Sequence, residues 1–124
     1  MEKTKKKVLV VEDNLNLRKL IVEKLEQEGF ATFVSETAEH GMQVVKEKRP
    51  NLILLDIMLP GGVNGFDLLE QLKRDPILKA IPVIVLTNLS TEERTANEIG
   101  AIDYVVKSDI SLDEVTLKVK NHLQ

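Results

Sequence analysis

Five side chains that suit phosphate chemistry follow the short apolar runs of this sequence. Glu12 and Asp13 come after the first run, Asp56 after a central one, Thr87 after a later one and Lys107 after the last. An aspartate can attack phosphorus as a nucleophile, and carboxylate oxygens are ligands that Mg²⁺ prefers. A hydroxyl and an ammonium can hold the phosphoryl oxygens. The set therefore predicts Mg²⁺-dependent transfer of a phosphoryl group onto Asp56.

The apolar runs that precede these residues are typical of strands buried on both faces of a parallel sheet. Segments with helical spacing lie between the runs, and the first of them carries Leu17, Leu20, Ile21 and Leu25 on its expected inner face. Strand-like and helical segments therefore alternate along the whole chain. The expected strands cover residues 8–11, 30–34, 52–55, 83–86 and 104–106.

Five strand–helix units in succession predict a doubly wound α/β fold, with helices on both faces of a five-stranded parallel sheet. We expect a three-layer (βα)5 sandwich with strand order 2-1-3-4-5. Ligands bind such sheets beyond the carboxyl ends of the strands, where the order reverses. The reversal lies between the first and third strands, so Asp13 and Asp56 should be close neighbours. Carboxylates that close repel each other, and a divalent cation relieves the repulsion.

Two serine-to-glutamate pairs have the spacing of a capping box, a reciprocal set of hydrogen bonds that opens a helix. Ser90 with Glu93 predicts a helix over residues 91–99. Ser111 with Glu114 predicts a second helix over residues 112–123.

The composition is that of one soluble domain over residues 1–124. Hydrophobic residues make up 43% of the chain and charged residues 30%, so the sequence can bury a core and lacks the polar excess of disordered chains. The absence of cysteine excludes disulfides and thiolate metal sites. No apolar stretch approaches the roughly 20 residues of a membrane span, and no signal peptide is visible. We therefore expect a cytoplasmic protein with no membrane partner.

The formal charge of -3 argues against nucleic acid as a direct partner, because phosphate backbones bind clustered positive surfaces. Lysines at positions 3, 5, 6 and 7 form one basic cluster. A short basic tail before a strand is more often a solvated feature than a binding arm. We therefore expect no direct contact with nucleic acid.

Each candidate residue also has a structural interpretation when it is taken alone. Acidic residues such as Glu12 and Asp13 stabilise a helix N-terminus, Thr87 can cap a loop, and Lys107 can be a surface lysine. Asp56 is harder to explain in this way, because a carboxylate directly after four apolar residues must find a partner or reach solvent. The coincidence of all five at successive strand ends favours one shared site.

At these residues the chain closely resembles the receiver domain of two-component response regulators. The resemblance extends from residue 8 to about residue 123, and the combination of motifs is specific. The motifs are the acidic pair Glu12 and Asp13, the segment LLDIMLP around Asp56, Thr87 after VIVL, and GAIDYVVK from Gly100 to Lys107.

The resemblance implies how the acidic residues work. In the family, the aspartate that matches Asp56 accepts a phosphoryl group from a sensor histidine kinase, a phosphotransfer protein or a small phosphodonor. Asp13, Asp56 and the carbonyl group of Met58 would hold the Mg²⁺ ion, and Glu12 would assist through a water molecule. Such a domain catalyses only its own phosphorylation and dephosphorylation, so we do not expect an enzyme acting on other substrates.

The resemblance also implies a switch. Thr87 and Lys107 would contact the phosphoryl group, and Tyr104 matches an aromatic residue that turns inward as the threonine moves towards the phosphate. The surface around Tyr104 and the helices expected over 91–99 and 112–123 would then bind an unknown downstream protein or form a phosphorylation-dependent homodimer.

Three positions depart from the family pattern. Ser108 follows Lys107 where the family usually has a proline, so the local loop geometry should differ. Asn88 follows Thr87 where a small residue is common, and it should narrow the access to Asp56. The segment 60–65 is one residue longer than usual, which should reshape the loop after Asp56.

Two apolar residues predict a slow return from the phosphorylated state. Met58 lies two positions after Asp56, and Leu89 lies two positions after Thr87. Neither side chain can orient an attacking water molecule, so we expect a long-lived phosphoryl group.

Two other classes of interpretation remain, a receiver-like scaffold and an enzyme or cofactor binder that shares the architecture, and the sequence argues against the second class. The chain could be a receiver-like scaffold that binds partners without phosphorylation, with Asn88 blocking the pocket. A haloacid-dehalogenase-like phosphatase needs a second aspartate where Met58 stands. A phosphate-binding loop lacks its Gly-rich Lys-Ser/Thr run, and a flavin site lacks aromatic partners in a chain with three phenylalanines, one tyrosine and no tryptophan.

Overall fold

The alternating apolar and amphipathic segments form a parallel sheet flanked by helices. The computed structural model describes residues 4–60 and 64–123. Two short 3-10 turns, Leu78–Ala80 and Lys107–Asp109, join the main elements. Within the described ranges, none of the helices combines the length and the apolar character needed to cross a bilayer. In chain order the main elements are β1 (Lys7–Val11), α1 (Leu15–Gln27), β2 (Ala31–Ser35), α2 (Ala38–Lys48), β3 (Leu52–Leu55), α3 (Gly65–Arg74), β4 (Val83–Thr87), α4 (Glu93–Ile99), β5 (Asp103–Val106) and α5 (Leu112–Leu123).

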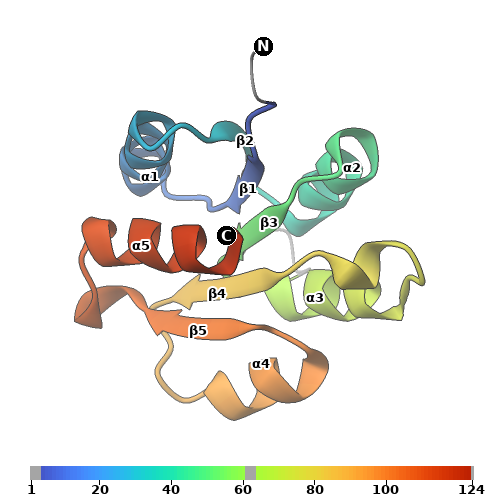
Figure 1. Ribbon diagram of the computed structural model, residues 1–124. Helices are drawn as coiled ribbons and strands as arrows, with labels where there is room; N and C mark the ends of the chain where they lie inside the picture. The colour runs from blue at the N-terminus through green and yellow to red at the C-terminus, as the bar shows by residue number, and fades with distance from the viewer. Residues whose placement is uncertain (1–3, 61–63, 124) are drawn as a thin grey trace.

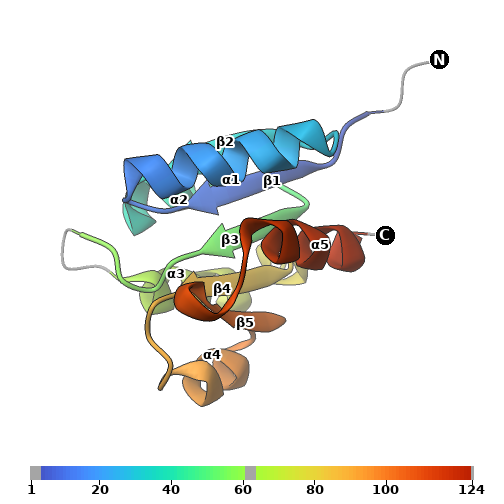
Figure 2. The ribbon, with the colours of Figure 1, turned by 90° about the vertical axis from the view of Figure 1, so that its left-hand side faces the viewer.

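The sheet has the strand order β2-β1-β3-β4-β5, with every neighbouring pair parallel (Figure 1). The predicted doubly wound α/β fold and its order are therefore confirmed. Val11 pairs with Leu55 at the ends of β1 and β3, whose arrows point to the same side in Figure 2. The N–H of Asp56 donates to the carbonyl oxygen of Val11 at 3.0 Å. The residue after β3 is thereby fixed beside the residues that follow β1.

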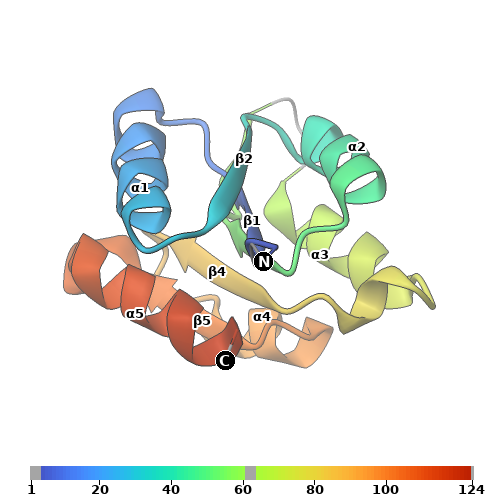
Figure 3. The same cartoon turned by 45° about the horizontal axis from the view of Figure 1, so that its top comes forward.

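The helices form one layer on each side of the sheet. Helices α1 and α5 lie together on one face, and α2 and α3 lie together on the other, with α4 beside α3 (Figures 1 and 3). Successive strand residues point to opposite faces. In β1, Val8 and Val10 join the cluster under α1 and α5, whereas Leu9 and Val11 join the cluster under α2 and α3. Burial on both faces explains why the strands are continuous apolar runs.

Several boundaries differ from the sequence expectations. Strand β2 begins at Ala31 rather than Phe30, and β4 includes Thr87 as its last residue. Leu20 was expected on the inner face of α1 but is 48% exposed. Arg18 is buried on that face together with Ile21 and Leu25.

The two predicted capping boxes have different outcomes. Ser111 Oγ accepts the N–H of Glu114 at 3.2 Å and lies 3.4 Å from its carboxylate, so α5 begins as expected. The expectation for Ser90 was wrong, because α4 begins only at Glu93 and Glu92 precedes it without a side-chain capping bond. Nearby, the N–H of Leu89 donates to Thr87 Oγ1, two residues before it, and its carbonyl oxygen accepts a hydrogen bond from the more distant Tyr104 hydroxyl.

Asp103 ties the edge strand β5 to α5 and should make stability depend on pH. Its carboxylate lies 3.1 Å from Lys118 Nζ and 3.5 Å from His122 Nε2, and it accepts the N–H of Tyr104 at 2.8 Å. Burial alone would raise the pKa of Asp103, but these contacts outweigh it and lower the pKa below its ordinary 3.8. A lowered pKa gives stability that is present above 3.8 and is lost as the pH falls through the folded-state value.

We therefore expect Asp103→Asn to lower the free energy of unfolding at neutral pH by about 1 kcal/mol. The difference from the wild type should shrink below pH 3.8, where the wild-type carboxylate also becomes protonated. Urea unfolding of both proteins, at neutral pH and below pH 3.8, measures this difference in the free energy of unfolding. Asp109→Asn, at an exposed position, is the control. A difference that stays constant with pH would contradict the assigned role.

Candidate functional site

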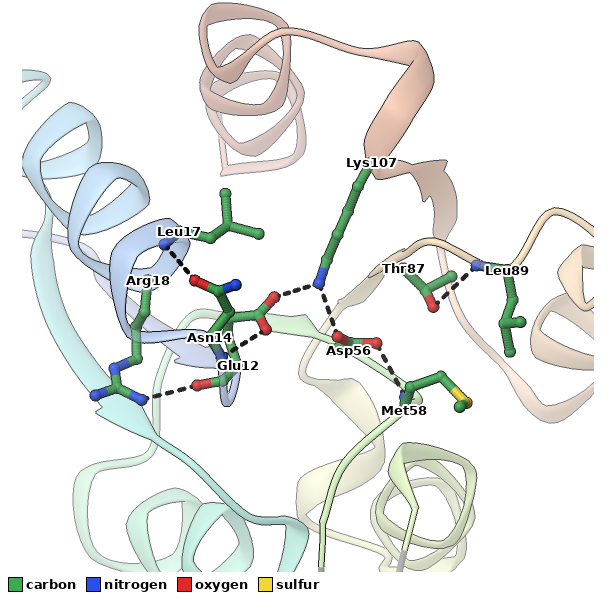
Figure 4. A network of polar contacts seen from close by, with 9 residues as sticks. All are labelled: Glu12, Asn14, Leu17, Arg18, Asp56, Met58, Thr87, Leu89 and Lys107. Carbon is green, nitrogen blue, oxygen red and sulfur yellow. Dashed lines mark hydrogen bonds and ion pairs between the residues drawn. The ribbon is translucent and has the colours of Figure 1, made fainter.

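The site residues meet at the carboxyl ends of four strands. Glu12 and Asp13 follow β1, Asp56 follows β3, Thr87 ends β4 and Lys107 follows β5. Because the strands are parallel and the order reverses between β1 and β3, these ends share one edge of the sheet. Figure 4 shows Glu12, Asp56 and Lys107 converging there from three different strands.

Three carboxylates form a compact oxygen cluster at this edge. Ligand oxygens of Glu12, Asp13 and Asp56 all lie within 4.8 Å of one another. Glu12 is 2% exposed and Asp56 is 5% exposed, whereas Asp13 faces solvent. Like charges this close raise the free energy of the ionised state, and a hard cation offsets the repulsion. The cluster can therefore hold a metal ion that prefers oxygen ligands.

Lys107 is the cation that faces the cluster in this structure. Its ammonium nitrogen lies 2.6 Å from Glu12 Oε1 and 2.8 Å from Asp56 Oδ2. Burial alone would lower the pKa of Lys107, but hydrogen bonds and charge interactions with the two carboxylates outweigh it and raise the pKa. Burial raises the pKa of Glu12, although the hydrogen bonds from Lys107 and from the N–H of Asn14 oppose the shift. Lys107 therefore remains an ammonium group throughout the neutral range.

Asp56 is held by a different donor on each carboxylate oxygen. Lys107 donates to Oδ2, and the N–H of Met58 donates to Oδ1 at 2.9 Å (Figure 4). These two bonds fix the plane of a carboxylate that is almost fully buried. The role of the Met58 carbonyl group as a metal ligand stays a prediction.

Thr87 and Tyr104 are connected through the backbone of Leu89. Thr87 is fully buried, and its hydroxyl accepts the N–H of Leu89 at 3.3 Å. The Tyr104 hydroxyl donates to the carbonyl oxygen of Leu89, and the ring packs with Ile57 and Val85. Both residues of the expected switch pair thus bond to the backbone of the loop that follows β4, and Figure 4 shows Thr87 on the same side of the site as Asp56.

Two residues that support Glu12 were missed from the sequence. The N–H of Asn14 donates to Glu12 Oε2 at 3.0 Å, and the Arg18 guanidinium donates to the carbonyl oxygen of Glu12 at 2.9 Å. A sequence signal for Arg18 exists, because positions 18, 21 and 25 share the spacing of one helix face. An arginine on the same face as Ile21 and Leu25 is a candidate for a buried, bonded side chain.

The three departures from the family pattern lie around this edge. Ser108 is exposed in the turn Lys107–Asp109, and no peptide bond within the described ranges is cis. Asn88 is exposed. The predicted extra residue in segment 60–65 falls partly on residues 61–63, which lie outside the described part of the chain.

A family model described as the response regulator receiver domain matches residues 8–120. The chain belongs to this family. The family membership expected from the motifs is therefore confirmed, and the chain contains a receiver domain of two-component signalling.

Individual relatives agree with the family assignment. The phosphate regulon transcriptional regulatory protein PhoB of Escherichia coli (strain K12) is 38% identical over 117 residues, which is 93% of this chain and 50% of PhoB. The BeF3-activated N-terminal receiver domain of RstA from Klebsiella pneumoniae superposes with a TM-score of 0.85 at 28% identity, covering 95% of this chain and 98% of that one. The Mn(2+)-bound form of response regulator Rcp1 gives a TM-score of 0.80 at 30% identity, covering 94% and 90%.

The receiver domain spans about half the length of the curated relatives that it matches, 45% for PhoB of Pseudomonas aeruginosa and 50% for PhoB of E. coli. These relatives are named transcriptional regulators. Their names point to control of transcription, so the comparisons do not support the expectation of no direct contact with nucleic acid.

Proposed function

We propose that this receiver domain is a phosphorylation switch in which Asp56 accepts the phosphoryl group. The observation that carries the proposal is the state of the Asp56 carboxylate. It is buried, each of its oxygens accepts one hydrogen bond, and two further carboxylates lie beside it. A carboxylate fixed in this way can present an oxygen to phosphorus without losing further conformational freedom.

The donor is a phosphohistidine of a sensor kinase or phosphotransfer protein, or a small acyl phosphate. An Asp56 oxygen forms the new bond to phosphorus while the bond from phosphorus to the imidazole nitrogen, or to the acyl oxygen, breaks. The electron pair of the broken bond stays on that leaving atom. Asp56 loses no proton, because it reacts as the carboxylate.

Lys107 and Thr87 hold the transferred group. The Lys107 ammonium lies 2.8 Å from Asp56 Oδ2, so it can form an ion pair with a phosphoryl oxygen once the group is bound to Asp56. Its raised pKa keeps it charged at neutral pH. Thr87 reaches the group by exchanging its bond with the N–H of Leu89 for one to a phosphoryl oxygen.

The carboxylate cluster fits Mg²⁺, an ion that takes oxygen ligands and retains water molecules for a phosphate. Asp13, Asp56 and the Met58 carbonyl group would hold the ion, and Glu12 would assist through water. When bound, Mg²⁺ neutralises negative charge on the phosphoryl oxygens. The similar response regulator Rcp1 is described in an Mn(2+)-bound form, which supports the proposal that this receiver domain binds a divalent cation.

The signal leaves through α4, β5 and α5. A movement of Thr87 towards the phosphoryl group would break its hydrogen bond with the N–H of Leu89. The carbonyl oxygen of the same residue accepts the Tyr104 hydroxyl, so the movement would also disturb the contact of Tyr104. The surface of these elements then binds a downstream protein or a second receiver domain. Control of transcription, the activity in the name of PhoB, is our proposal for the output. The net charge of -3 favours DNA contact away from the receiver surface itself.

The scaffold alternative depended on Asn88 narrowing the access to Asp56. Asn88 is exposed at the surface, and its effect on that access stays a prediction. We favour the phosphorylation switch because the residues beside Asp56 suit phosphoryl transfer.

Intact-mass spectrometry after incubation with an acyl phosphate tests the proposal. In Mg²⁺ we expect one added phosphoryl group, and in EDTA almost none. Lack of uptake in Mg²⁺, together with failure of beryllium fluoride to bind, would contradict the switch and favour the scaffold.

The lifetime of the phosphoryl group gives a further prediction. Met58 is exposed and apolar, and Leu89 packs against the cluster around Tyr104, so neither side chain can orient water for attack. The phosphorylated form should be long-lived, and Met58→Asn should speed its loss on the order of tenfold. This is less than the roughly 100-fold that a positioned general base contributes at least, because an amide can orient water but does not take its proton. The decay of the phosphorylated mass after donor removal measures both rates. Ile77→Asn, also at an exposed apolar position, is the control. A wild-type decay as fast as that of short-lived signalling receivers would contradict this account.

A further inference from the structure

Arg18 is a buried charged residue that the phosphorylation chemistry does not use. It lies in the first turns of α1 and is only 8% exposed. One guanidinium nitrogen donates to the carbonyl oxygen of Glu12 at 2.9 Å (Figure 4). A buried arginine needs such partners, because an unpaired charge away from water is costly.

The ion pair of Arg18 does not account for its burial. A second guanidinium nitrogen lies 3.6 Å from Glu36 Oε1, but the Glu36 side chain is 71% exposed. Ion pairs with an exposed partner contribute little. The bond to the Glu12 carbonyl oxygen is therefore the contact with the larger consequence.

That bond completes a clamp on one peptide segment. The N–H of Glu12 donates to the carbonyl oxygen of Ser35 at 2.9 Å, so β2 holds Glu12 on one side. Arg18 holds the carbonyl oxygen of the same residue from α1. Asp13 comes next in the chain, and Asn14 then begins the helix by accepting the N–H of Leu17 at 3.0 Å. The backbone that carries both acidic residues is thus fixed from two directions.

We propose that Arg18 is a positioning residue for the metal-binding carboxylates. By fixing the Glu12 carbonyl group, it directs the oxygens of Glu12 and Asp13 towards Asp56, where they gather within 4.8 Å. This inference rests on the proposed function, since it assumes that the cluster binds a divalent cation. Residues that orient metal ligands through hydrogen bonds typically change affinity by about 10-fold to 100-fold when they are removed.

The chemistry of arginine suits this role better than that of lysine. A planar guanidinium offers N–H groups in two fixed directions, one for the Glu12 carbonyl oxygen and one for Glu36. A lysine ammonium on a flexible stem can keep the charge and one bond, but it does not fix the direction of the carbonyl group.

Binding of Mn²⁺, measured by the electron paramagnetic resonance signal of the free ion, tests the proposal without any phosphodonor. We expect Arg18→Met to bind Mn²⁺ about tenfold more weakly than the wild type. Arg18→Lys should lose less, and Glu36→Gln should stay within about twofold, because that ion pair is exposed. Val119→Ala serves as a destabilised control, since Val119 is buried in α5 and has no part in the cluster. It should keep wild-type affinity at a temperature where it is folded.

The outcomes separate this inference from the proposed function. Mn²⁺ affinity of Arg18→Met within twofold of the wild type would overturn the role of Arg18 and leave the proposed function standing. Equal weakening in Arg18→Met and Val119→Ala would also overturn it, because the loss would then follow stability. If the wild type binds no Mn²⁺, both the role of Arg18 and the proposed metal-dependent function are contradicted. Should Arg18→Met not fold, Arg18→Gln is judged by the same twofold threshold.

Discussion

Lys107→Met is expected to lower the free energy of unfolding by about 3 kcal/mol at neutral pH, because it leaves two buried carboxylates facing each other without their cation. Glu12 and Asp56 are 2% and 5% exposed, and Lys107 contacts both. A methionine preserves the length and most of the packing of the lysine stem, so the change isolates the charge. Phosphoryl uptake should fall as well, since the transferred group loses its ammonium partner.

The pH dependence of this variant gives a sharper signature. Burial raises the pKa of Glu12 even in the wild type, and the hydrogen bond from Lys107 restrains that shift. Removing Lys107 should raise the pKa further. A carboxyl group whose folded-state pKa is raised gains stability as the pH falls through that value towards its ordinary 4.5. The deficit of Lys107→Met should therefore shrink as the pH falls from neutral towards 4.5.

Urea unfolding across this pH range, with and without Mg²⁺, measures the effect. Added Mg²⁺ should recover part of the stability of Lys107→Met, because the ion replaces the missing positive charge. Lys19→Met, at an exposed position in α1, should behave as the wild type throughout. A loss under 1 kcal/mol at neutral pH, or a deficit that does not change with pH, would contradict the assigned role.

Gly65→Ala is expected to cost about 3 kcal/mol and to disturb Asp56 itself, because an added methyl group has no room. A Cβ atom there would clash with the carbonyl oxygen of Asp56 and lie 2.6 Å from the Cα atom of Ile57. Both are backbone atoms, and the N–H of Gly65 also donates to the carbonyl oxygen of Ile57 at 3.0 Å. Relief therefore requires a shift of the segment that carries Asp56, so phosphoryl uptake should fall together with stability.

Gly41→Ala is the matched control. A Cβ atom at Gly41 would lie 3.3 Å from a methyl group of Leu68 and 3.4 Å from one of Val11, and both are side-chain atoms that can move. Alanine also favours the helix by about 1 kcal/mol over glycine, which offsets the tight contacts. Urea unfolding and phosphoryl uptake, measured on Gly65→Ala and Gly41→Ala, compare the effects of the two substitutions on stability and on the site. Equal, small effects at both positions would show that the close approach at Gly65 does not constrain the site.

The strands and the site edge were predictable because local pattern and global fold agree at those residues. Four consecutive apolar residues before Asp56 are required by burial on both faces of the sheet, and the parallel arrangement then brings the strand ends together. Asp56 could be singled out because a carboxylate in that place needs partners. The structure supplies them in Lys107 and the N–H of Met58.

The misses arise where contacts that form only in the folded structure decide the role of a residue. Arginine is a residue type usual on the solvated face of a helix. Its spacing with Ile21 and Leu25 places Arg18 on the inner face, but its bond to the Glu12 carbonyl oxygen is visible only in the structure. Ser90 and Glu93 have the spacing of a helix start, but the neighbouring Leu89 backbone is held by Thr87 and Tyr104, and the helix begins later. The Tyr104 hydroxyl comes from a residue 15 positions away, so its bond to Leu89 cannot be read from the residues around Ser90.

The claim that Asp56 accepts the phosphoryl group is tested most directly by locating that group in the phosphorylated chain. Borohydride reduces an aspartyl phosphate to homoserine, which peptide mass spectrometry locates to one residue. After treatment with Mg²⁺ and an acyl phosphate, we predict homoserine at position 56, an unchanged Asp13, and no homoserine in Asp56→Asn. Homoserine at Asp13 or elsewhere, or equal phosphoryl uptake by Asp56→Asn, would contradict the account.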